Sequence, residues 1–286
     1  AASDVYKRQI LFLLTMYICC VIVSYESCIM RVSTDAINSF SKSVCTAASG
    51  ALSGFNLQAA GKVMGIIMKN ILTFLEENAI KYKDKTAFVD LNDSVTYAEL
   101  LERAQSIGSA LSKTGTKNKP IAVYFDKCVN TISAMLGVVY SGNFYVVIDS
   151  EMPPARINKI FGALSPVAVI TDKKHHENAL QLEFSGEIFD LEEALSCEIN
   201  SEKLAQIRSR QIDTDPLYAL FTSGSTGVPK GAVVSHKSVM AYSEWVSSTF
   251  DITSETVFAN QTPFYFSMSV TDVYSTCLLY TSPSPR

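Results

Sequence analysis

Hydrophobic and polar residues follow two different periods along the middle of the chain. Residues 96–111 carry apolar side chains three and four positions apart, which predicts an amphipathic helix, and Thr96 with Glu99 forms a capping box at its start. Residues 120–125 form a short continuous apolar run, which is typical of a buried strand. Segments of these two kinds alternate. The predicted helices are 68–84, 96–111, 130–140, 153–164, 239–250 and 270–276, and the predicted strands are 120–125, 144–148, 167–171, 187–189, 217–221 and 232–235.

This alternation indicates parallel βαβ units and therefore an α/β domain, because two parallel neighbouring strands need a crossover helix between them. His175 and His176 lie in a charged stretch between predicted elements. Adjacent residues on a helix do not converge on one point. We therefore predict a solvated loop or helix start at these histidines rather than a metal or acid-base pair.

The two ends of the chain differ from its patterned middle. Residues 10–25 carry no charge, yet they are short for a membrane span and close to the upper length of a signal-peptide core. Residues 1–9 and the last ten residues resemble translated linker sequence. The apolar segment is open to three interpretations, a membrane anchor, a signal or translated DNA foreign to the protein, and we favour the last. The predicted parts are a leader outside the native domain (1–63), a globular part (64–277) and a foreign tail (278–286).

Composition narrows the functional classes. The chain has 286 residues, 24 of them basic and 28 acidic, and the absence of a Lys/Arg run argues against nucleic-acid binding. Its seven cysteines form no Cys-x-x-Cys pair, and its three histidines lack partners at zinc-ligand spacing. We therefore expect neither a nucleic-acid partner nor a protein-held metal.

Residues 222–231, Thr-Ser-Gly-Ser-Thr-Gly-Val-Pro-Lys-Gly, lie between two apolar runs that we expect to be buried strands. Glycine lets the backbone approach a ligand closely, hydroxyls add uncharged donors, and a lysine supplies the cation that attracts phosphate. The pattern differs from the P-loop. A hairpin turn would explain the composition, but not a lysine between Pro229 and Gly231. We predict a phosphate-binding loop made of Thr222, Ser223, Gly224, Ser225, Thr226, Gly227, Lys230 and Gly231.

With these residues the chain resembles the acyl-adenylate-forming superfamily. Residues 221–231 match its phosphate loop, [YF]TSGSTGxPKG, without departure. Residues 95–104 look like its early TYxEL helix, and residues 141–157 resemble the block GAAYVPIDPxxPxxRI of amino-acid adenylation domains. Residues 260–274 are similar to NQxPFxFDxSVxDIY of D-alanine:carrier-protein ligases. The resemblance covers about residues 68–277.

The resemblance implies a fold and a reaction. The fold would be the N-terminal part of the adenylate-forming enzyme fold, with mixed and parallel sheets flanked by helices and without the small C-terminal domain. The reaction would use ATP and Mg²⁺ to convert a carboxylic or amino acid into an acyl-adenylate for a carrier-protein phosphopantetheine or coenzyme A thiol in the cytoplasm. The catalytic lysine of such enzymes lies in the C-terminal domain. We therefore identify no catalytic residue and expect residual nucleotide affinity at most from this chain.

The resemblance also implies a substrate pocket. Ser267 stands where amino-acid-activating relatives have an Asp that pairs with the substrate ammonium, so activation of an α-amino acid loses a charge-assisted bond. Asp272 lies more than one helical turn further on and is not expected to replace it. His236 either lines the acyl or nucleotide side or caps a helix. The expected pocket residues are His236, Phe264, Phe266, Ser267 and Asp272.

Two alternative functions remain open at the level of sequence. The first is an acyl-CoA or acyl-carrier ligase for a non-amino carboxylate, which Ser267 favours and residues 141–157 disfavour. The second is a non-catalytic, membrane-anchored nucleotide-binding protein that uses residues 10–25 as its anchor. We favour the amino-acid adenylation reading and expect no membrane partner.

Overall fold

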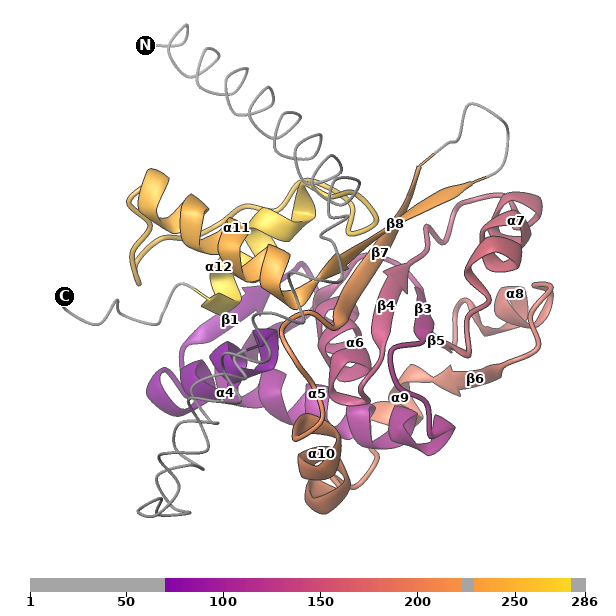
Figure 1. The fold of residues 1–286 in the computed structure, drawn as a ribbon, viewed down its shortest axis with the longest axis horizontal. Coiled ribbons are helices and arrows are strands. Elements are labelled where there is room, and N and C mark those ends of the chain that lie inside the picture. Colours follow the sequence, from indigo (N-terminus) through magenta and orange to yellow (C-terminus); the bar gives the residue numbers. More distant parts are fainter. Residues whose placement is uncertain (1–69, 223–228, 279–286) are drawn as a thin grey trace, which may run out of the picture. The chain divides into compact units, whose positions relative to one another are not determined.

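Figure 1 shows the computed structural model, which describes residues 70–222 and 229–278. Contacts divide the chain into residues 1–64 and residues 65–286, and all described residues belong to the second unit. The predicted leader and all but the first residue of the predicted tail lie outside the described residues, so the three-part division stays a prediction. No helix of the described residues is long and apolar enough to cross a membrane.

A mixed sheet forms the centre of the described unit, in the strand order β6-β5-β3-β4-β7-β8. Its neighbouring strands are parallel except for the antiparallel pair β7 and β8. This confirms the predicted α/β class. The strands are β3 (Pro120–Tyr124), β4 (Phe144–Val147), β5 (Ala168–Thr171), β6 (Glu187–Asp190), β7 (Pro216–Thr222) and β8 (Lys230–Ser235). A separate antiparallel pair, β1 (Thr86–Val89) and β2 (Ser94–Thr96), was not expected from the pattern.

The predicted helices are present with small shifts at their ends. Thr96 accepts a bond from the Glu99 N–H at 3.3 Å, and the Glu99 carboxylate accepts one from the Thr96 N–H at 2.8 Å, which confirms the capping box. Four short helices, at residues 112–114, 176–180, 191–195 and 201–208, add to the prediction. The helices are α4 (Ile71–Lys81), α5 (Tyr97–Leu111), η1 (Ser112–Thr114), α6 (Val129–Tyr140), α7 (Pro154–Leu164), α8 (His176–Leu180), α9 (Leu191–Leu195), α10 (Ser201–Arg208), α11 (His236–Thr249) and α12 (Ser269–Leu278).

The central strands are apolar throughout because helices cover both faces of the sheet. Ile121 and Val123 of β3 face a core shared with α4, α5, α6 and α12. Ala122 and Tyr124, the alternate residues, face a second core shared with α7 and α8. Side chains on a strand point to opposite faces in turn, so both sets of positions must be apolar.

The connections after the neighbouring strands β3 and β5 leave in opposite directions across the sheet. After β3 the chain enters α6 on one face and continues to β4, and after β5 it enters α8 on the other face and continues to β6. The carboxyl ends of two such strands flank a crevice where ligands bind in open α/β sheets. Residues 125–128 and 172–175, which follow β3 and β5, therefore lie at a favoured position for a site.

Candidate functional site

The predicted phosphate loop connects the ends of the β7–β8 hairpin, which extends from the sheet in Figure 1. Thr222 is paired with Lys230, and Phe221 with Gly231. The loop residues Ser223, Gly224, Ser225, Thr226 and Gly227 lie outside the described residues. Lys230 therefore begins β8 directly across the hairpin from the residue at which the loop starts.

Gly231 lies beneath the ring of its cross-strand partner. A Cβ atom at this position would lie 2.9 Å from the Phe221 ring, closer than carbon atoms pack without displacement. Phe221 thus covers the glycine, an arrangement that stabilises a glycine in a strand. The absence of a side chain at Gly231, the last glycine of the motif, is therefore explained by packing against Phe221 as well as by its position next to the loop.

The expectation that two buried strands flank the loop is wrong for the second strand. Residues 230–233 of β8 are exposed, and β8 is the last strand of its sheet. A hydrophobic run does not distinguish a central strand from an edge strand, since that depends on what the rest of the chain packs against it.

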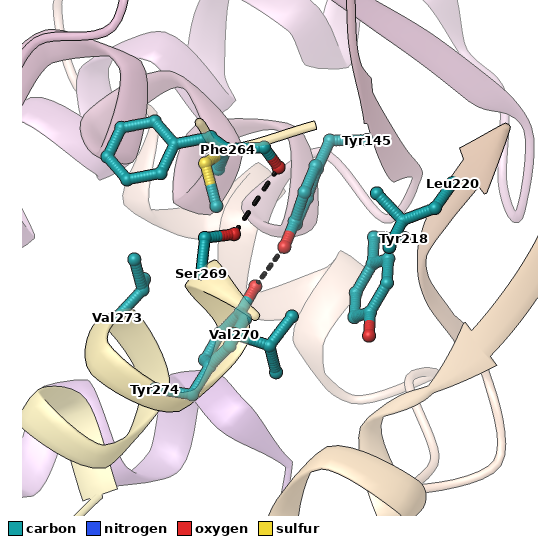
Figure 2. A pocket seen from close by; sticks show the side chains of 9 residues that line it. Tyr145, Tyr218, Leu220, Phe264, Ser269, Val270, Val273 and Tyr274 are labelled. Carbon is teal, nitrogen blue, oxygen red and sulfur yellow. Dashed lines mark hydrogen bonds between the residues drawn. The ribbon is translucent and has the colours of Figure 1, made fainter. Parts of the chain in front are cut away.

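An aromatic pocket lies beside the hairpin, between β4, β7 and α12 (Figure 2). The Tyr145 and Tyr274 hydroxyls are 2.7 Å apart, and the Tyr218 ring stacks on Tyr145 at 5.7 Å between centroids. Burial raises the pKa of both Tyr145 and Tyr274 well above the usual value, so these phenols are neutral hydrogen-bonding groups. The pocket has no room for a water molecule, and its lining contains no charged side chain: Met135, Tyr145, Tyr218, Leu220, Phe264, Ser269, Val270, Val273 and Tyr274.

Among the expected pocket residues, Phe264 lines this pocket, and Ser267 lies in the turn that leads into α12. The Ser267 carbonyl accepts a bond from the Val270 N–H at 3.2 Å. Phe266 is 55% exposed and contacts Tyr265 instead. Asp272 accepts a bond from the Asn260 amide at 2.8 Å, and burial raises its pKa. Asp272 does not line the described pocket.

His236 begins α11 and is buried beneath the start of α4. Its ring Nδ1 accepts a hydrogen bond from the Ile71 backbone N–H at 3.5 Å, while the backbone N–H of His236 donates to the Asp215 backbone carbonyl at 3.2 Å. Burial lowers the His236 pKa to about 4. Free N–H groups at a helix start need acceptors. The His236 side chain supplies one of them, so of the two roles left open for His236 this geometry is that of a helix cap. The capped helix is α4 rather than α11, to which His236 itself belongs.

The spacing of apolar residues in α12 could have predicted part of the pocket lining. Val270, Val273 and Tyr274 all line it, and they are spaced as one face of a helix. Met135, Tyr145 and Tyr218 come from distant parts of the chain, and no local pattern brings them together.

The prediction of a solvated position is wrong for His175. Its side chain is 7% exposed, and its ring nitrogens lie 2.6 Å from Asp172 Oδ1 and 3.3 Å from Asp126 Oδ1. His176 does start a helix, as predicted. The described ranges contain no group of three or more His, Cys, Asp or Glu side chains suited to hold a metal ion.

Solved structures share this fold. FmoA3, a nonribosomal peptide synthetase, superposes with a TM-score of 0.65 at 22% identity and covers 74% of this chain and 22% of its own. The N-terminal subdomain of Klebsiella oxytoca NpsA gives 0.62 at 18% identity, over 74% and 54% of the two chains. These values confirm the predicted fold, the N-terminal part of the adenylate-forming enzyme fold.

Sequence relatives agree with the fold. Tyrocidine synthase 3 of Brevibacillus parabrevis is 31% identical over 201 residues, which are 70% of this chain and 3% of that protein. The D-alanine–D-alanyl carrier protein ligase of Listeria welshimeri is 31% identical over 224 residues, or 73% of this chain and 41% of the ligase. The chain thus spans less than half the length of these relatives. The family model described as AMP-binding enzyme matches residues 75–280, and the chain therefore belongs to the AMP-binding enzyme family.

Proposed function

We propose that this chain carries part of the nucleotide and acyl sites of an ATP-dependent ligase that forms acyl-adenylates. The observation that carries this proposal is the course of β7. Tyr218 and Leu220 of this strand line the aromatic pocket, and the strand ends at Thr222, where the phosphate loop begins. A single strand therefore joins the aromatic pocket to a loop suited to a triphosphate, and we propose that the acyl group binds beside this closely packed pocket rather than inside it.

The residues that we propose for ATP binding are chemically matched to phosphate. Backbone N–H groups, hydroxyls and one ammonium group stabilise the negative charge that develops on departing pyrophosphate. Mg²⁺ would reduce the charge of the triphosphate, and its usual ligands include substrate phosphates and water. The proposed set is Thr222, Ser223, Gly224, Ser225, Thr226, Gly227, Lys230 and Gly231.

The acid and the acceptor belong to the same proposal. We propose an amino acid that is transferred to the phosphopantetheine thiol of a carrier protein in the cytoplasm, since matched relatives are D-alanine–D-alanyl carrier protein ligases. A second candidate is a carboxylic acid without an ammonium group. Ser267 and the uncharged lining of the described pocket favour that candidate.

Binding of Mg·ATP tests the nucleotide site. In calorimetry we expect the 286-residue chain to bind Mg·ATP, and Lys230→Met to weaken binding by about tenfold through loss of one charge-assisted contact. Lys237→Met is the matched control, because Lys237 is an exposed lysine of α11 and should leave affinity unchanged. No binding by the unaltered chain, or equal affinities for both variants, would contradict the assignment.

A further inference from the structure

Lys127 lies in the loop between β3 and α6, at the crevice beside the carboxyl ends of β3 and β5. Its Nζ donates hydrogen bonds to the backbone carbonyl oxygens of Asn260, at 2.8 Å, and Thr262, at 3.1 Å. It also lies 5.2 Å from the centroid of the Phe264 ring, within cation–π range. One ammonium group thus makes three contacts with residues 260–264, which are far from it in sequence.

The contacted segment lies outside the regular secondary structure. Residues 260–268 form neither helix nor strand, so no backbone ladder fixes their course. The Asn260 amide donates to Asp272 Oδ2 on α12 at 2.8 Å. Asn260 is therefore held through its carbonyl by Lys127 and through its side chain by α12.

The segment held in this way forms part of the pocket. Phe264 is 6% exposed and lines the pocket, and its carbonyl accepts a bond from Ser269 Oγ at 3.5 Å (Figure 2). A shift of residues 260–264 would therefore move one wall of the pocket.

The backbone that carries Lys127 is fixed as well. The neighbouring Asp126 carboxylate accepts a bond from Ser150 Oγ at 2.6 Å and pairs with Lys174 and His175. Ser150 follows β4, and the other two partners follow β5. Contacts from two neighbouring strand ends thus hold the residue beside Lys127 at the carboxyl edge of the sheet.

We propose that Lys127 is a positioning residue for the aromatic pocket. It fixes residues 260–264, and through them the Phe264 ring, although its charge lies outside the pocket lining. The link to an acyl group rests on the proposed function, whereas the ordering of the segment rests on the contacts alone.

Hydrogen exchange of the full chain tests the ordering. In Lys127→Met, which keeps most of the stem and removes the charge, amides of residues 256–268 should exchange about tenfold faster, since two hydrogen bonds are lost. Lys127→Arg should restore most of the protection. Lys119→Met is the matched control, because Lys119 is exposed immediately before the same strand. Unchanged exchange in Lys127→Met, or equal changes throughout the protein, would overturn the proposal.

Binding tests the link to the acyl site separately. Lys127→Met should weaken binding of alanyl sulfamoyl adenosine, a stable acyl-adenylate analogue, by about tenfold relative to AMP. Equal losses for both ligands would overturn the link between Lys127 and binding of the acyl group. If the unaltered chain binds AMP and the analogue equally, the proposed acyl site fails, while the exchange result still decides whether Lys127 orders the segment.

Discussion

The hydroxyl oxygens of Tyr145 and Tyr274 lie 2.7 Å apart in the interior and connect β4 to α12. Tyr145 is 2% exposed and Tyr274 is 1% exposed, and Tyr218 stacks on the first of them from the neighbouring strand. The two residues are separated by 129 positions. This bond therefore forms only when α12 packs against the sheet, and it forms part of the wall of the pocket (Figure 2).

Removal of either hydroxyl should destabilise the protein, and removal of both should cost less than the sum of the two single losses. Tyr274→Phe leaves the Tyr145 hydroxyl buried without this partner, which should lower the free energy of unfolding by about 1–3 kcal/mol. The double variant with Tyr145→Phe should lose less than the sum of the single changes. Urea unfolding of the four proteins measures this coupling, and strictly additive losses would show that the bond contributes nothing.

The crossing of α5 and α6 should not tolerate larger residues. A Cβ at Gly108 would lie 2.5 Å from Tyr140 Cβ, and one at Gly137 would lie 2.5 Å from Ile107 Cγ2. Gly137→Ala should therefore lower stability by about 1–3 kcal/mol through overpacking. Gly162→Ala is the control, because a Cβ there meets nothing within 4 Å; it should raise stability by about 0.5–1 kcal/mol through helix propensity. Thermal unfolding distinguishes the two outcomes, and a neutral Gly137→Ala would contradict the close packing.

His236 should make folding sensitive to acid. Its pKa is about 4 in the folded protein, against an ordinary value of 6.5, so the unfolded chain binds a proton first as pH falls. The free energy of unfolding is therefore unaffected by this group above about pH 6.5, and it decreases progressively as the pH falls towards about 4. The loss should be about 3 kcal/mol in total.

His236→Gln supplies the comparison, because it removes the titrating group. Denaturant unfolding at several pH values should give a shallower decline for this variant than for the unaltered chain. Parallel declines would show that protonation of His236 is not coupled to folding.

A carboxylate at position 267 should favour acids that carry an ammonium group. Ser267→Asp should raise affinity for alanyl sulfamoyl adenosine over the propionyl analogue by about tenfold, because only the first offers a cation to pair. Ser267→Asn has the same shape without the charge and should not change the ratio. Equal ratios in the two variants would count against pairing of the substrate ammonium at this position.

Local patterns predicted most of the elements because local forces form them. The capping box at Thr96 and Glu99 involves residues three positions apart, and the apolar runs of β3, β4 and β5 had to be buried somewhere. The hairpin β1–β2 was missed because its strands are short and half exposed. The burial of His175 was missed because its partner Asp126 lies at the end of another strand.

The sequence by itself determined the α/β class, the family and the position of the phosphate loop between two strands, since periodicity and a contiguous motif are local properties. Only the tertiary structure decided that β8 is an exposed edge, that His236 serves α4, and that Tyr145, Tyr218 and Tyr274 form one pocket. It also decided that Lys127 holds residues 260–264. Each of these depends on which segments the sheet order brings together, and the energy of such contacts exists only after distant parts of the chain have packed.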